Sequence, residues 1–144
     1  MNEANTESAI RVSNAVAAGT SLVTSAAVDM ANFEGCKFYV PIGTVVSGAA
    51  TSVKLQGSDD NSTYADIEGS AVTVADDDDN KVVVIDIFRP RTRYLKALVV
   101  RATENATVDG IIAVRYGARV YPTTDDASTV ITRELHQSPA AGTA

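Results

Sequence analysis

Residues 53–67 read VKLQGSDDNSTYADI and contain the clearest hairpin signal in the chain. Val53 and Leu55 alternate with polar residues, which is the two-residue period of a half-buried strand. The small and polar residues 57–62 favour a turn, because they tolerate left-handed backbone or hydrogen-bond to it. A second strand resumes at residues 64–67. The stretch predicts a β-hairpin with a long loop. We expect similar hairpin units to be built around this one.

Alternation of this kind recurs along the chain and predicts an all-β protein. The sequence favours further strands at 10–18, 22–28, 36–42, 70–74, 81–88, 94–102 and 111–120. Pro41 lacks a backbone donor, so its strand should lie at an edge or contain a bulge there. Residues 43–52 are small and favour a long loop. Short strands with frequent turns and no long helix predict an antiparallel β-sandwich or jelly roll.

Two predicted strands, 81–88 and 94–102, are apolar on both faces. A strand that is solvated on one face normally alternates apolar and polar residues. These strands should therefore be buried on both sides, or should place one face against another protein chain.

Composition divides the chain into three segments. Residues 1–9 are polar and acidic, which predicts a flexible N-terminal arm, and residues 10–122 form the predicted β-sandwich domain. Residues 123–144 form an extended C-terminal arm whose few large apolar residues are Val130, Ile131 and Leu135. A short helix is expected at 127–135. The arm is either a disordered tail or a segment that becomes ordered on a neighbouring subunit.

Length and charge limit the classes of function. A chain of 144 residues predicts one domain with a substantial core. The net charge of −6 argues against a nucleic-acid binder, which needs a basic surface. Neither a membrane-spanning run nor a basic, apolar leader is present in the sequence, so we expect no membrane partner and synthesis in a cytoplasm.

The reactive residues do not form a recognisable catalytic set. The single histidine, His136, lies in the C-terminal arm, and the single cysteine, Cys36, is at a core-facing strand position. We therefore expect no enzyme activity, no cofactor and no metal site. Residues 59–63 resemble the start of a calcium loop, but Tyr64 and Ser70 stand where its glycine and glutamate belong. A hairpin turn is the favoured interpretation there, and an ordinary acidic turn at 76–79.

Arg89, Arg91 and Arg93 form the basic cluster of the sequence. Arginine binds carboxylates with two parallel hydrogen bonds. Two interpretations remain open. The cluster is either a solvated loop paired locally with Asp86 or the acidic turns, or a contact for an acidic partner surface. In the second interpretation the candidate partner contacts are these arginines together with Val130, Ile131 and Leu135.

Three motifs in order, at 28–40 (VDMANFEGCKFYV), 53–60 (VKLQGSDD) and 93–99 (RYLKALV), resemble small β-sandwich decoration proteins of tailed-phage capsids, also called cement proteins. The resemblance spans roughly residues 10–120 and does not cover the chain from Thr123 onward. It implies a structural virion protein that binds the outside of the capsid and bridges coat subunits. The implied partners are the major capsid protein and a second or third copy of the chain, as a dimer or trimer.

Two alternatives lie outside this interpretation. The Gly-Ser-Asp-Asp turn also bears a looser likeness to discoidin-type carbohydrate-binding jelly rolls, and a tail or fibre accessory protein of a virion is a further alternative. Sugar binding usually needs exposed aromatic platforms. The chain has no tryptophan, and its tyrosines lie mostly within or beside predicted strands.

Overall fold

The computed structural model describes residues 2–137 and 140–143. The predicted hairpin is present as β6 (Ala50–Ser58) and β7 (Ala65–Asp66), which pair antiparallel with Gln56 opposite Asp66. β6 is central in one sheet, between β10 (Tyr94–Ala102) on one side and β7 and β8 (Val72–Val74) on the other. Two short strands, β3 (Val23–Thr24) and β4 (Val28–Asp29), pair with the far side of β10.

The other sheet is built on β5 (Gly35–Val45). One side of β5 pairs with β9 (Val82–Phe88). The opposite side pairs first with β12 (Ile111–Tyr116) and then with β11 (Ala106–Val108). β1 (Ser8–Ser13) lies beyond β12, and β2 (Val16–Gly19) lies beyond β11.

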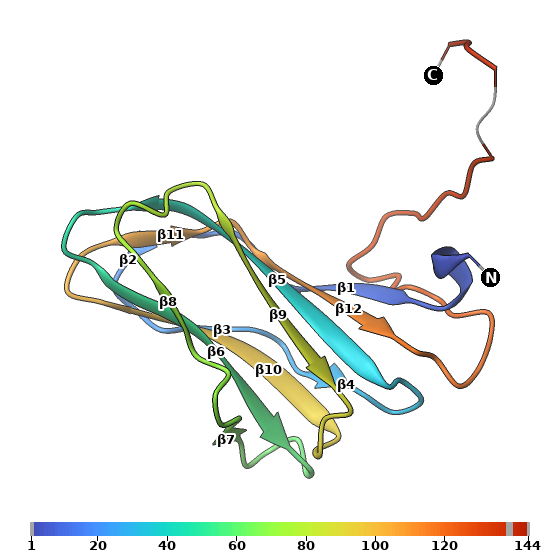
Figure 1. Cartoon of the computed structure of the whole chain (residues 1–144), viewed down its shortest axis with the longest axis horizontal. Coiled ribbons are helices and arrows are strands. Elements are labelled where there is room, and N and C mark those ends of the chain that lie inside the picture. Colours follow the sequence, from blue (N-terminus) through green and yellow to red (C-terminus); the bar gives the residue numbers. More distant parts are fainter. Residues whose placement is uncertain (1, 138–139, 144) are drawn as a thin grey trace.

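Figure 1 shows the two sheets stacked on each other. Their apolar sides face each other and form the core. Phe38, Leu55 and Leu95 are fully buried between them. All strand pairings are antiparallel, and the described residues outside the strands contain a single 3₁₀ turn, η1 (Glu3–Asn5). The prediction of an all-β antiparallel sandwich is confirmed. Among the described residues, no helix has the length and apolar character that crossing a membrane requires.

Three local predictions were wrong. Residues 43–52 are not a long loop, because β5 continues to Val45 by pairing with β11 and the Val45 N–H donates to Asp79 at 2.6 Å. The last strand stops at Tyr116 rather than residue 120, because Gly117 adopts a φ of +65° that turns the chain. Residues 127–135 form a turn and extended chain, not a helix.

Pro41 lies inside β5, not on an edge strand. Its carbonyl accepts the Asp109 N–H at 2.9 Å, at the point where the neighbouring strand changes from β12 to β11. A residue's N–H and C=O point to the same side of a strand. The missing donor of Pro41 therefore faces a junction between strands, where no ladder hydrogen bond is lost.

The start of the C-terminal arm lies along the outer edge of β1. The Ala9 N–H donates to Asp125 Oδ1 at 2.6 Å, the Asp126 N–H donates to the Ala9 carbonyl at 3.2 Å, and the Arg11 N–H donates to Thr129 Oγ1 at 3.1 Å. β1 itself begins at Ser8, inside the segment predicted as the N-terminal arm. Beyond these contacts the chain runs away from the sandwich (Figure 1).

Asp60 organises the turn of the β6–β7 hairpin. Its Oδ1 accepts hydrogen bonds from the Ser58 hydroxyl at 2.8 Å, the Ser62 N–H at 2.9 Å and the Thr63 N–H at 2.7 Å. The backbone and hydroxyl donors hold the pKa of Asp60 far below its usual range. The residues that suggested a calcium loop therefore form a turn in which the carboxylate binds its own backbone.

A buried arginine closes the end of the core that lies near β2 and β11. Arg101 is 5% exposed, and its guanidinium donates to the carbonyls of Ser21 at 2.8 Å, Ala17 at 2.9 Å and Ala106 at 2.6 Å. These acceptors belong to three separate segments. Arg101 therefore ties β2, the following loop and β11 to β10.

Replacing Arg101 with methionine should lower the free energy of unfolding by about 3 kcal/mol, because the apolar stem is retained while buried carbonyls lose their donors. Urea denaturation of the purified protein measures this change. The control is Arg11→Met on β1, where the side chain is exposed and the effect should be within about 0.5 kcal/mol. Equal effects of the two variants would contradict the structural role assigned to Arg101.

Replacing Asp60 with asparagine should destabilise the protein at neutral pH and much less in acid. The folded-state pKa is lowered, so the stabilisation is present above the ordinary aspartate value of 3.8 and is lost as the pH falls toward the folded-state pKa. Thermal melts from pH 7 to pH 2 should show the gap between wild type and Asp60→Asn closing below pH 3.8. Asp59→Asn is the matched control, since the Asp59 carboxylate accepts no hydrogen bond among the described residues.

Candidate partner-binding surface

A hollow of about 570 Å³ lies where the β9–β10 loop meets the segment before β5. Its floor is apolar and is formed by Met30, Phe33 and Pro90. Its rim carries the predicted arginines together with one that the sequence analysis missed: Arg89, Arg91, Arg93 and Arg119. We call this floor and rim the arginine surface.

Backbone hydrogen bonds bring the separate segments of the arginine surface together. The Arg89 N–H donates to the Glu34 carbonyl at 2.7 Å, which joins the end of β9 to the start of β5. The Arg119 N–H donates to the Asn32 carbonyl at 2.9 Å, which brings in the chain that follows β12. Arg119 is far from the other arginines in sequence, and no local pattern connects it to them.

Two of the four arginines are paired with carboxylates. Arg93 donates to both oxygens of Asp29, at 2.9 Å and 2.8 Å, and this pairing holds the pKa of Asp29 below its usual range. Arg89 lies 3.9 Å from a Glu34 oxygen in a looser ion pair. Local pairing is thus present, but with Asp29 and Glu34 rather than with Asp86, which accepts the Tyr116 hydroxyl at 2.7 Å.

Arg91 and Arg119 form no ion pair with any residue that the structure describes. The arginine surface therefore has two arginines without an ion-pair partner among the described residues, and Glu34 and Asp59 also line the hollow, in a protein whose net charge is −6.

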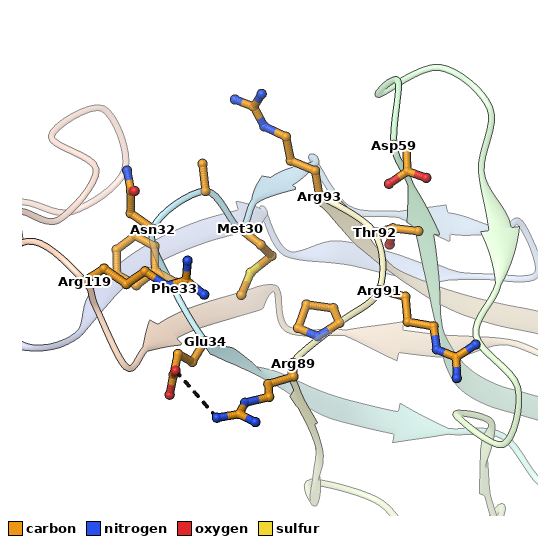
Figure 2. Close-up of a pocket in the computed structure, with 12 residues that line it drawn as sticks. Met30, Asn32, Phe33, Glu34, Asp59, Arg89, Arg91, Thr92, Arg93 and Arg119 are labelled. Carbon is orange, nitrogen blue, oxygen red and sulfur yellow. Dashed lines mark ion pairs between the residues drawn. The ribbon is translucent and has the colours of Figure 1, made fainter.

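The rim arginines are spread out rather than convergent. Figure 2 shows the guanidinium groups of Arg89, Arg91 and Arg93 pointing in different directions around the hollow. A small anion needs donors that converge on one point. A divergent rim around an apolar floor instead suits a broad partner surface, on which an apolar group is flanked by carboxylates.

The apolar residues of the C-terminal arm do not contribute to the arginine surface. Val130 and Leu135 line a separate hollow of about 370 Å³, together with residues near the N-terminus. Ile131 is completely exposed. Five of the six residues predicted as partner contacts therefore lie in two separate hollows, and Ile131 lines neither of them.

The residues considered for catalysis lie apart. Cys36 is fully buried in β5, and burial raises the pKa of its thiol to about 12. His136 is on the exposed arm, where its Nε2 lies 3.0 Å from Glu134 Oε2. The described residues contain no group of three or more His, Cys, Asp and Glu side chains arranged to hold a metal ion.

The acidic turn at 76–79 binds backbone instead of simply facing solvent. Asp76 accepts the Gly48 N–H at 2.9 Å, and Asp79 accepts the Val45 N–H at 2.6 Å. Asp78 accepts the Ala75 N–H at 3.0 Å and is paired with Lys81 at 2.6 Å. These contacts fix the loop between β5 and β6, so the turn has a structural role beyond solubility.

No family model matches the sequence, and no curated protein matches it. Solved structures do share the fold. One is a protein of Bacillus endospore appendages, which form a family of disulfide-linked pili; it has 13% sequence identity and a TM-score of 0.50, over 77% of this chain and 88% of that one. Another is the PBSX exported protein XepA, with 15% identity and a TM-score of 0.54 over 94% of this chain. The chain spans only 42% of the length of XepA. At these identities the similarity establishes a common β-sandwich fold.

Proposed function

We propose that this protein is a structural component of a phage virion that binds the outside of the capsid and stabilises it by bridging coat subunits. The proposal is supported by the three sequence motifs that resemble those of capsid decoration proteins and occur in the same order. The fold is compatible with it, since structures that share the fold include a protein of pili and an exported protein.

The observation that carries the proposal is the arginine surface. A basic rim with two unpaired arginines on an acidic protein is an electrostatically distinct contact region. Arginine is also enriched at the centres of protein interfaces, where it combines apolar contact with directional hydrogen bonds. The floor of Met30, Phe33 and Pro90 supplies the apolar area that such a centre needs.

The proposed attachment is non-covalent. The appendage proteins that share the fold form disulfide-linked pili, but the single cysteine of this sequence is fully buried in β5. A disulfide needs an accessible thiolate at each end. Attachment through charge and apolar contact is therefore the mode that these residues favour.

Bridging requires a second contact on the same molecule. The C-terminal arm offers one, because Ile131 and Leu135 are 102% and 61% exposed on a segment that runs away from the sandwich (Figure 1). Two weak contacts on one chain bind a repetitive surface far more tightly than either contact alone. The arm is accordingly assigned to a neighbouring coat subunit.

Reversing both unpaired charges, in Arg91→Glu combined with Arg119→Glu, should weaken binding to capsid shells by about tenfold or more, because carboxylates would then face carboxylates. Co-sedimentation with expanded and unexpanded shells of the phage's major capsid protein measures this binding. The control is Arg11→Glu on β1, a single charge reversal at a position outside the arginine surface.

Three results would count against the proposed function. The wild-type protein could fail to sediment with either shell, the double variant could bind as well as wild type, or the Arg11 control could lose binding equally. If the protein does not bind shells, glycan binding and attachment to purified tails are the next measurements, since these distinguish the carbohydrate-binding and tail-accessory alternatives.

Arg89 provides a separate test, because it has a left-handed backbone with φ of 52°. Left-handed backbone costs a non-glycine residue about 1 kcal/mol, and the ion pair at 3.9 Å offsets little of that cost. Arg89→Gly should therefore keep or raise the free energy of unfolding, by up to about 1 kcal/mol, while weakening shell binding. Urea denaturation and co-sedimentation check the two effects. A clear loss of stability would show that Arg89 is needed for folding rather than for binding.

A further inference from the structure

Strand β9 has one edge that no other strand covers in the part of the chain that the structure describes. β9 pairs with β5 through Lys81, whose carbonyl accepts the Ile42 N–H at 2.8 Å, and at Arg89, whose N–H donates to Glu34 at 2.7 Å. Because the direction of backbone groups alternates along a strand, the odd-numbered residues between them also face β5. The N–H and C=O groups of Val82, Val84, Asp86 and Phe88 consequently point away from β5, toward open space.

Strands are normally kept from pairing between molecules by lysine, proline, bulges or covering segments. Within residues 82–88 there is no lysine, proline or bulge, and no described segment hydrogen-bonds over this edge, although Lys81 and Pro90 flank the strand. Val82, Val84 and Phe88 are 54%, 48% and 58% exposed. The one charged residue, Asp86, is already engaged by the Tyr116 hydroxyl at 2.7 Å and lies opposite Lys37 on β5. At seven residues, β9 is the longest edge strand left uncovered among the described residues.

The other long edge of the same sheet is treated differently. β1 has six residues, and the start of the C-terminal arm covers it with hydrogen bonds from Ala9 and Arg11. The two long edges of this sheet therefore differ, since β1 is covered and β9 is open.

We infer that β9 pairs antiparallel with β9 of a second copy, which makes one continuous sheet across a twofold axis at Ile85. In this register Val84 lies opposite Asp86 of the second copy, and Val82 lies opposite its Phe88. The backbone N–H and C=O groups of Val82, Val84, Asp86 and Phe88, which point away from β5, then all form hydrogen bonds with the second copy. The register centred on Asp86 would place two carboxylates face to face, and the register centred on Val84 would leave Phe88 without a partner.

The space beside β9 also fits a second copy. A hollow of about 280 Å³, lined by Val72, Val74 and Val83 among others, lies between β9 at the edge of one sheet and β8 at the edge of the other. In the proposed register, Ile87 of the second copy lies opposite Val83, over this hollow. Pairing would therefore cover the partly exposed inner side of β9 as well as its backbone.

Light scattering of the isolated protein tests this inference, and because no shell is present the result is independent of the proposed function. We expect twice the mass of one chain. Val84→Pro should raise the dissociation constant of the dimer at least about tenfold, because it removes an outward-facing N–H that β5 does not use. Ile112→Lys on β12 is the control, since Ile112 is exposed on the outer face of the sheet but lies away from the β9 edge. Circular dichroism establishes that both variants remain folded. If the proline variant does not fold, Val84→Glu replaces it, because the new carboxylate would lie opposite Asp86 of the second copy.

A cysteine pair tests the register. Residues on the axis of an antiparallel pair have Cα atoms about 4.5 Å apart, within disulfide range, so Ile85→Cys should form a disulfide-linked dimer under mild oxidation. Val83→Cys is the matched control, because its equivalent in the second copy is four residues further along, roughly 13 Å away. A monomer at all concentrations would overturn the inference. So would an open-ended polymer, a dimer that Ile112→Lys disrupts and Val84→Pro does not, or equal crosslinking of the two cysteine variants.

Discussion

The structure depends on β5 being hydrogen-bonded along both edges while every second side chain is buried. Cys36, Phe38 and Val40 are all completely buried, and Ile42 is 2% exposed. A shift of one residue in the pairing of β5 would turn all of these side chains toward solvent. The burial pattern therefore fixes the register of β9, β12 and β11 at once. The positions of the loops at both ends of β5 follow from that register.

The arginine surface is one consequence of this constraint. Glu34 directly precedes β5, and Arg89 directly follows β9, so the pairing of Gly35 with Phe88 places the two residues side by side. Tyr116 lies opposite Gly35 on the other side, which brings the chain leading to Arg119 to the same end of the sheet. The four arginines are held by strand ends rather than by a long mobile loop. Such support is what a contact surface needs to avoid the entropic cost of ordering on binding.

The sequence predicted those features that depend on local periodicity. The β6–β7 hairpin, the alternating burial of β5 and the antiparallel sandwich all follow from patterns within about ten residues. The features it missed depend on hydrogen bonds between distant residues. Asp79 extends β5 by accepting the Val45 N–H, and Asp125 accepts the Ala9 N–H from 116 positions away. No sequence period records such contacts, and for the same reason Arg119 was not recognised as part of the arginine surface.

The apolar character of both faces of β9 left two explanations open, burial on both faces or contact with another chain. The structure buries only the inner side, where Ile85 and Ile87 pack against the core, and leaves the outer side exposed. β10 has the other outcome, since Leu98 on its outer side is 5% exposed within the same chain. Two strands with similar sequence patterns thus have different surroundings. The hydrophobic pattern shows only that a strand face is apolar. Whether other parts of the same chain bury that face depends on the tertiary arrangement of the strands. For the outer side of β10 they do, and for the outer side of β9 the described residues do not.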